Sequence, residues 1–191
     1  MNPDDHIDSP KSYPKGRPVR FGFIGRITDT KGIDILLKAV KLLQTENWEL
    51  KIAGKGNVDY IVQLKDIYKD NRIEFLGFTD PDAFYESIDV LICPSVYGEP
   101  LPRVVYEAYR AALPVIVSDR GGTPEIVDHG KNGFVYEGRD YKTLAVHMDT
   151  LASEPDLYDA MSAASAEKAK IFTCSHIVSE FTEQLEKVIG K

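Results

Sequence analysis

Short apolar runs alternate along the chain with longer segments in which apolar residues recur every three or four positions. The apolar runs are rich in Val, Ile, Leu and Phe, which is typical of strands buried on both faces of a sheet. They fall at residues 19–25, 48–53, 72–76, 89–94, 114–118 and 133–136.

The intervening segments have the spacing of amphipathic helices. The first carries Ile33, Leu36, Leu37, Val40 and Leu43, and the second carries Tyr60, Ile61, Leu64 and Ile67. Further helices are expected from Asp80 onward and at residues 103–112, 124–127, 141–151, 156–170 and 176–189.

Strands that alternate with helices predict a parallel sheet, and the right-handed crossover rule gives it helices on both faces. The expected fold is α/β, a Rossmann-like doubly wound parallel sheet of about six strands. Residues 18–191 form this single domain. Residues 1–17 are polar and Pro-rich, so they are expected to be a flexible tail or interdomain linker that contributes no core.

Composition narrows the function classes. The net charge is −7, which argues against nucleic-acid binding and against direct contact of this domain with an anionic membrane. Cys93 and Cys174 give neither a disulfide framework nor metal-ligand spacing. With no signal peptide and no apolar run of membrane-spanning length, a cytoplasmic location is expected, with any membrane attachment made through another domain.

Basic residues and glycines gather where strands end, the edge at which such sheets bind ligands. Arg26 and Lys31 flank the loop after the first strand, which leads into a helix N-terminus. Two cations and a helix dipole suit a diphosphate, and a solvated loop with two surface cations fits this segment equally well.

Glu99 and Glu107 are separated by seven residues, in a Gly-Glu-Pro loop that leads into a helix. The unpaired N–H groups at a helix N-terminus favour an anion such as phosphate. Carboxylates beside such a site would repel phosphate unless they accept hydrogen bonds from sugar hydroxyls. The pattern therefore predicts a ligand that carries both phosphate and sugar.

Two further motifs favour structural roles. Asp80-Pro81-Asp82 has the form of a metal-binding D-x-D, but Asp80 suits a helix N-cap and Pro81 the first helical position. The four histidines lack metal spacing, so no metal is predicted.

In their order and spacing, these residues resemble the C-terminal, donor-binding domain of retaining glycosyltransferases with the two-domain GT-B architecture, glycosyltransferase family 4. The resemblance covers about residues 19 to 190. Its components are residues 25–26, 31–32, 52–56, 75–78, 94–95, Glu99 with Glu107, 114–116, 121–127 and 130–134.

The resemblance implies a role for each candidate residue. Glu99, Arg26 and Lys31 would be the catalytic set, with Glu99 on the transferred sugar and the two cations on the diphosphate. Gly25 would border the donor, Phe78 its base, and Glu107 would hold the ribose. Backbone around Pro100, Leu101 and Arg103 would contact phosphate and sugar.

The resemblance also implies partners. The donor would be a UDP- or GDP-linked sugar that needs no cofactor or metal, and the acceptor a glycan or glycolipid in polysaccharide, glycolipid or glycan synthesis. The family's N-terminal acceptor-binding domain is missing from this chain, so the chain alone is expected to bind donor and to transfer little.

One departure leaves an alternative open. The family commonly has an aromatic-Gly pair where this chain has Leu101-Pro102, and Pro102 has no N–H to donate. A non-catalytic module that binds or assembles with nucleotide sugars is therefore the alternative. A nicotinamide-dependent oxidoreductase is disfavoured, because the G-x-G-x-x-G fingerprint is absent.

Overall fold

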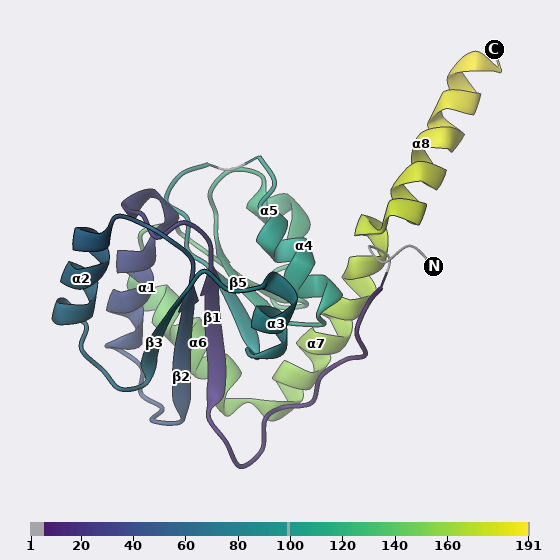
Figure 1. Cartoon of the computed structure of the whole chain (residues 1–191). Helices are drawn as coiled ribbons and strands as arrows, with labels where there is room; N and C mark the ends of the chain where they lie inside the picture. The colour runs from purple at the N-terminus through teal and green to yellow at the C-terminus, as the bar shows by residue number, and fades with distance from the viewer. Residues whose placement is uncertain (1–5, 99, 191) are drawn as a thin grey trace.

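The computed structural model describes residues 6–98 and 100–190 as an α/β domain (Figure 1). The strands are β1 (Val19–Ile24), β2 (Trp48–Ala53), β3 (Ile73–Gly77), β4 (Val90–Cys93), β5 (Val115–Ser118) and β6 (Gly133–Tyr136). The helices are η2 (Asp29–Lys31), α1 (Ile33–Val40), α2 (Val58–Ile67), α3 (Pro81–Glu86), α4 (Arg103–Arg110), α5 (Thr123–Ile126), α6 (Tyr141–Ser153), α7 (Pro155–Ala169), η3 (Lys170–Phe172) and α8 (Cys174–Ile189).

The six strands form one parallel sheet in the order β3-β2-β1-β4-β5-β6. The predicted fold class is therefore confirmed, and each predicted strand lies within two residues of the observed one at both ends. The chain runs outward from β1 in one direction and from β4 in the other, so the switch point lies between these two strands. A ligand crevice is expected at their carboxyl ends.

Alternate side chains of the central strands enter two separate cores. Val90 and Ile92 of β4 face the core built with α1, α2 and α6, whereas Leu91 and Cys93 face the core built with α3, α4 and α5. This follows from the two-residue period of a strand. It explains why β4 and β5 are almost entirely apolar and buried at every position.

Two glycines allow loops at the carboxyl edge to approach one another closely. A Cβ on Gly32 would lie 1.8 Å from the Pro94 carbonyl oxygen, and one on Gly54 would lie 1.7 Å from that of Gly25. Both residues have positive φ, at 70° and 140°, which L side chains rarely adopt. Glycine at these positions lets the loops after β1, β2 and β4 close around one edge.

The prediction that the N-terminal segment contributes no core is wrong for residues 6–17. Lys11 N donates to Ser162 Oγ at 2.7 Å and Tyr13 N to Asp159 Oδ1 at 2.6 Å, so the segment runs along α7 (Figure 1). The Tyr13 ring packs edge-on against Tyr158 at 5.8 Å between centroids. Polar composition concealed this docking, because the segment is held mainly by hydrogen bonds to partners far along the chain.

A buried ion pair anchors the end of this segment. Asp89 is 3% exposed and accepts hydrogen bonds from Arg17 at 2.6 and 2.8 Å and from Arg20 at 2.8 to 3.1 Å. Burial opposes ionisation of Asp89, but the hydrogen bonds from the two arginines outweigh it, and the pKa of this carboxyl lies below its usual value.

Helix α8 projects away from the rest of the domain (Figure 1). None of its described residues is buried. Across the part of the chain that the structure describes, no helix is both long enough and apolar enough to cross a membrane.

Candidate functional site

Two cavities that share part of their lining lie at the carboxyl end of the sheet, and a third lies between α3 and α4. The first, of about 190 Å³, is lined by the ends of β1 and β4 and by the start of α4, at the switch point of the sheet. Its lining residues are Phe23, Ile24, Gly25, Arg26, Lys31, Ile92, Cys93, Ser95, Pro102, Arg103 and Val104.

This first cavity is the cationic part of the site. Arg26 follows β1 directly, and Lys31 ends η2 just before the N-terminus of α1. Both line the cavity together with Arg103. Three cations beside the open N–H groups of a helix N-terminus can hold a multiply charged anion such as a diphosphate.

The second cavity is apolar and measures about 430 Å³. It shares Ile24, Gly25, Arg26, Arg103 and Val104 with the first and extends to Ala53, Gly54, Lys55, Phe78, Thr79, Pro81 and Glu107. Phe78 is 77% exposed, and Lys55 Nζ lies 5.0 Å from its ring centroid. An exposed aromatic ring at the border of an apolar cavity offers a stacking surface for a planar ring.

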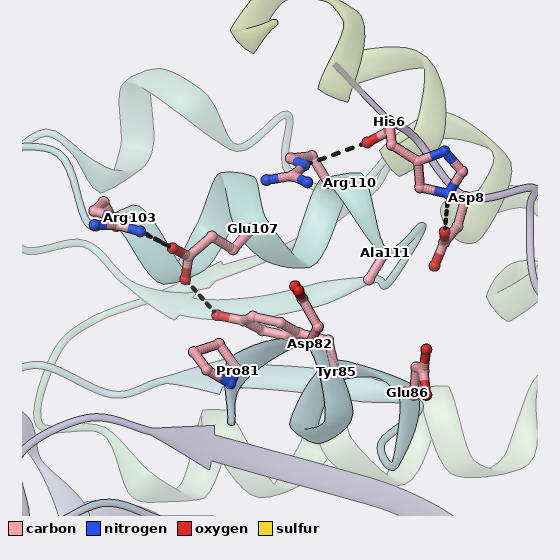
Figure 2. A pocket seen from close by; sticks show the side chains of 10 residues that line it. All are labelled: His6, Asp8, Pro81, Asp82, Tyr85, Glu86, Arg103, Glu107, Arg110 and Ala111. Atoms are coloured by element: carbon pink, nitrogen blue, oxygen red, sulfur yellow. Dashed lines mark hydrogen bonds and ion pairs between the residues drawn. The ribbon is translucent and has the colours of Figure 1, made fainter. Parts of the chain in front are cut away.

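The third cavity lies on the other side of Glu107 and measures about 490 Å³ (Figure 2). Its walls come from α3, from α4 and from the docked N-terminal segment, which contributes His6 and Asp8. Arg110 of α4 donates from Nε to the His6 carbonyl at 3.3 Å and closes this end of the cavity. The segment after residue 5 is therefore part of the site's surroundings, which the sequence did not predict.

Glu107 stands between the second and third cavities and is held from both sides (Figure 2). Tyr85 Oη donates to its Oε2 at 2.9 Å. Arg103 donates to its Oε1 from Nε at 3.0 Å and from Nη2 at 2.7 Å. A carboxylate so oriented can accept further hydrogen bonds from a pair of hydroxyls.

The structure brings most of the predicted residues together. Gly25, Arg26, Lys31, Phe78, Arg103 and Glu107 all line the first or second cavity. Pro100 and Leu101 are not among the described residues that line the three cavities. The Pro100 carbonyl instead lies 2.0 Å from where a Cβ on Gly122 would stand. Glu99 lies outside the described residues, so its placement stays a prediction.

The structure also bears on the Asp80-Pro81-Asp82 motif and on metal binding. Asp80 is the N-cap of α3, accepting from Ala83 N at 3.0 Å, with Pro81 in the first turn. This confirms the capping interpretation of Asp80-Pro81-Asp82. Within residues 6–98 and 100–190, no group of three or more His, Cys, Asp or Glu side chains could hold a metal ion.

Sequence reasoning missed Tyr85 and Lys55 as parts of the site. Lys55 carried a signal, because it stands between two glycines at the end of a predicted strand. Tyr85 carried none, because it looks like an ordinary apolar position of a short helix. Only the packing of α3 against α4 shows that its hydroxyl faces a carboxylate.

Residues 5–168 match the family described as glycosyl transferases group 1. An uncharacterized glycosyltransferase of Methanocaldococcus jannaschii is 38% identical over 138 residues, which cover 69% of this chain and 35% of that protein. Spore coat protein SA of Bacillus subtilis is 31% identical over 163 residues, which cover 78% of this chain and 43% of that protein. The chain thus spans less than half the length of these relatives.

Solved structures of other proteins contain the same fold as this chain. The Anabaena protein HepE, crystallised with UDP, superposes with a TM-score of 0.82 at 25% identity, over 90% of this chain and 49% of that one. The C-terminal domain of LpcC, a group 1 family protein of Francisella tularensis, superposes with a TM-score of 0.76 at 23% identity, and 97% of that domain is covered. The chain belongs to the glycosyl transferases group 1 family, and its fold is that of the family's C-terminal domain.

Proposed function

We propose that this chain is the donor-binding domain of a retaining glycosyltransferase that moves a sugar from a nucleoside-diphosphate sugar to an acceptor. One observation carries the proposal. The apolar cavity bordered by Phe78 also has the Glu107 carboxylate in its wall, and it shares Arg26 with the cavity that Lys31 lines. An aromatic surface, a carboxylate and a cluster of cations suit the base, the ribose and the diphosphate of one nucleoside diphosphate.

The proposed chemistry depends on the cations. When the bond between sugar and diphosphate breaks, negative charge grows on the leaving phosphate. Arg26, Lys31 and the N-terminus of α1 would stabilise this charge in position, without reorganisation at the moment of reaction. Glu99 is the proposed contact to the transferred sugar.

UDP is the donor nucleotide that the comparisons favour. HepE crystallised with UDP and with UDP-glucose, and it is 25% and 26% identical to this chain in those complexes. Other relatives are named for amylovoran and capsular polysaccharide biosynthesis. We therefore propose a UDP-linked sugar as donor, and polysaccharide synthesis as the setting.

A second domain is proposed to complete the enzyme. Ile177, Phe181, Leu185 and Val188 recur at helical spacing along α8 and are 42% to 73% exposed. Such a stripe normally faces a partner. We propose that an acceptor-binding domain covers this apolar stripe of α8 and also faces the carboxyl edge of the sheet, where the cavities lie.

The test is calorimetric binding of UDP, GDP, ADP and NAD to this chain in the presence of EDTA. We expect one diphosphate to bind. Lys31→Ala should then lower the affinity for that nucleotide roughly 10-fold or more, as expected for loss of a charge-assisted hydrogen bond. Lys187→Ala on α8 removes an equal charge from an exposed ion pair with Glu183 and should have no effect.

Two outcomes would contradict the proposal. Preference for NAD over all three diphosphates would indicate oxidoreductase chemistry. Equal weakening by Lys31→Ala and Lys187→Ala would mean that the loop after β1 holds no phosphate.

A further inference from the structure

The two groups that hold Glu107 differ sharply in burial. Tyr85 is 4% exposed, whereas the Arg103 side chain is 78% exposed and that of Glu107 is 18% exposed. Each oxygen of the carboxylate therefore has a partner of a different kind. One partner is fixed in the core, and the other lies at the surface.

Tyr85 is held by its surroundings. Its ring packs edge-on against Phe84 at 5.8 Å and lies in the core beneath α3 and α4. Burial, together with the nearby Glu107 carboxylate, raises the pKa of this hydroxyl far above its usual value. The hydroxyl is therefore protonated throughout the working pH range, and toward a carboxylate it can act only as a donor.

Arg103 is free to exchange partners. It is the first residue of α4 and pairs with Glu107 one helical turn away. An ion pair whose cation is exposed in this way contributes little to stability, so breaking it costs little. Arg103 lines all three cavities, including the one that holds Arg26 and Lys31. A guanidinium can bind phosphate oxygens in a bidentate manner.

We propose that Arg103 occupies Glu107 Oε1 in the free protein and gives it up to a ribose hydroxyl when a nucleoside diphosphate binds, turning its guanidinium toward the diphosphate. Tyr85 keeps its hydrogen bond to Oε2 throughout and is the positioning residue for the ribose contact (Figure 2). This inference rests on the proposed function, because it assigns roles within the same site.

The exchange has a consequence for each ligand fragment. A nucleoside alone competes with Arg103 for Glu107 and offers no phosphate in return. A diphosphate offers a new partner for the released guanidinium, so phosphate and ribose contacts reinforce one another. A nucleotide without ribose hydroxyls leaves the Glu107–Arg103 pair intact and gains nothing from Tyr85.

The experiment measures binding of UDP, 2′,3′-dideoxy-UDP and uridine to the whole chain and to Tyr85→Phe and Arg103→Ala, by calorimetry or ligand-observed NMR. For Tyr85→Phe we expect UDP to bind roughly 5- to 10-fold more weakly, the scale of one hydrogen bond to a charged group. Dideoxy-UDP should change less than twofold. Tyr109→Phe is the matched control, because Tyr109 is a buried tyrosine whose hydroxyl contacts Ile126 O and Asn132 Oδ1 instead.

Arg103→Ala should change the affinities for UDP and for uridine differently. UDP should bind roughly 5-fold or more weakly, since one charged phosphate contact is lost, whereas uridine should bind equally well or better. Arg103→Lys retains a cation and should restore part of the UDP affinity. In a Glu107→Gln background, Tyr85→Phe should have little further effect on UDP affinity, and Arg103→Ala tests the exchange without any change at Tyr85.

The outcomes distinguish this inference from the function on which it rests. If the unaltered chain binds no nucleoside diphosphate, including GDP and ADP run alongside, the proposed function fails. If UDP binds but Tyr85→Phe weakens UDP and dideoxy-UDP equally, Tyr85 is structural and the positioning role is wrong. If Arg103→Ala weakens uridine and UDP equally, the exchange is wrong.

Discussion

The two ends of the chain show how little regular secondary structure says about attachment. Residues 6–17 form no helix or strand, yet they are held by Ser162, Asp159 and, through Arg17, the buried Asp89. Helix α8 is a regular helix of 16 residues and buries none of its described side chains. The irregular end is part of the domain, and the regular end presents its apolar stripe to solvent.

This contrast has a physical basis. An irregular segment can be anchored by a few hydrogen bonds and by one ion pair to a buried carboxylate, because leaving such a carboxylate unpaired costs much more than forming the pair gains. A helix satisfies its own backbone, so it can persist without tertiary contacts along most of its length. Stability should therefore respond strongly to changes at the first end and weakly at the second.

The largest effect is expected from Asp89→Asn. The change leaves Arg17 and Arg20 without their buried acceptor, and breaking a buried pair typically costs about 3–5 kcal/mol of unfolding free energy. Urea denaturation should measure the loss. Asp66→Asn on the exposed surface of α2 is the control and should stay within about 0.5 kcal/mol. A loss below about 1 kcal/mol for Asp89→Asn would remove the contrast between the two ends.

Acid should reproduce part of that loss in the unaltered chain. Because the pKa of Asp89 is lowered in the folded state, its contribution is complete above the unfolded-state value near 3.9 and disappears as the pH falls through the folded-state value. Each unit of pKa difference corresponds to about 1.4 kcal/mol. Denaturation between pH 7 and pH 3 should show the gap between the unaltered chain and Asp89→Asn narrowing at the acid end. A constant gap would mean that the pair contributes through packing alone.

A smaller effect is expected from Tyr13→Phe. The Tyr13 hydroxyl donates to the Ala152 carbonyl, and removing one such bond should lower the unfolding free energy by about 1 kcal/mol. Proteolysis of residues 6–17 should also become faster, because the segment is held less tightly. Tyr97→Phe, at an exposed tyrosine, should change neither quantity, and an equal response of both variants would show that the docked segment is not specifically held.

The smallest effect is expected from Phe181→Ser on α8. Phe181 is 65% exposed, so the domain should lose no more than about 0.5 kcal/mol. The buried counterpart is Leu144→Ala on α6, at 0% exposure, where about 2–5 kcal/mol should be lost. If Phe181→Ser destabilised this chain by more than about 1.5 kcal/mol, α8 would have to pack against the domain in solution.

The sequence by itself determined the sheet, its strands and four charged residues of the site, Arg26, Lys31, Arg103 and Glu107. Local periodicity carries this information, because burial on both faces requires continuous apolar runs, and helix starts require residues such as Asp80 and Pro81. The clustering of Arg26, Lys31 and Glu107 at one edge also followed, since carboxyl ends of parallel strands share an edge.

Only the tertiary structure decided which side chains meet. Arg17 and Asp89 lie 72 positions apart and Tyr85 and Glu107 lie 22 apart, so no local pattern reports either contact. Side-chain direction, helix packing and the path of an irregular segment set these pairings. The Tyr85 hydroxyl and the Arg17 guanidinium would be ordinary polar groups if α3 or the N-terminal segment packed elsewhere. Tertiary packing, and not local sequence, therefore determined these contacts.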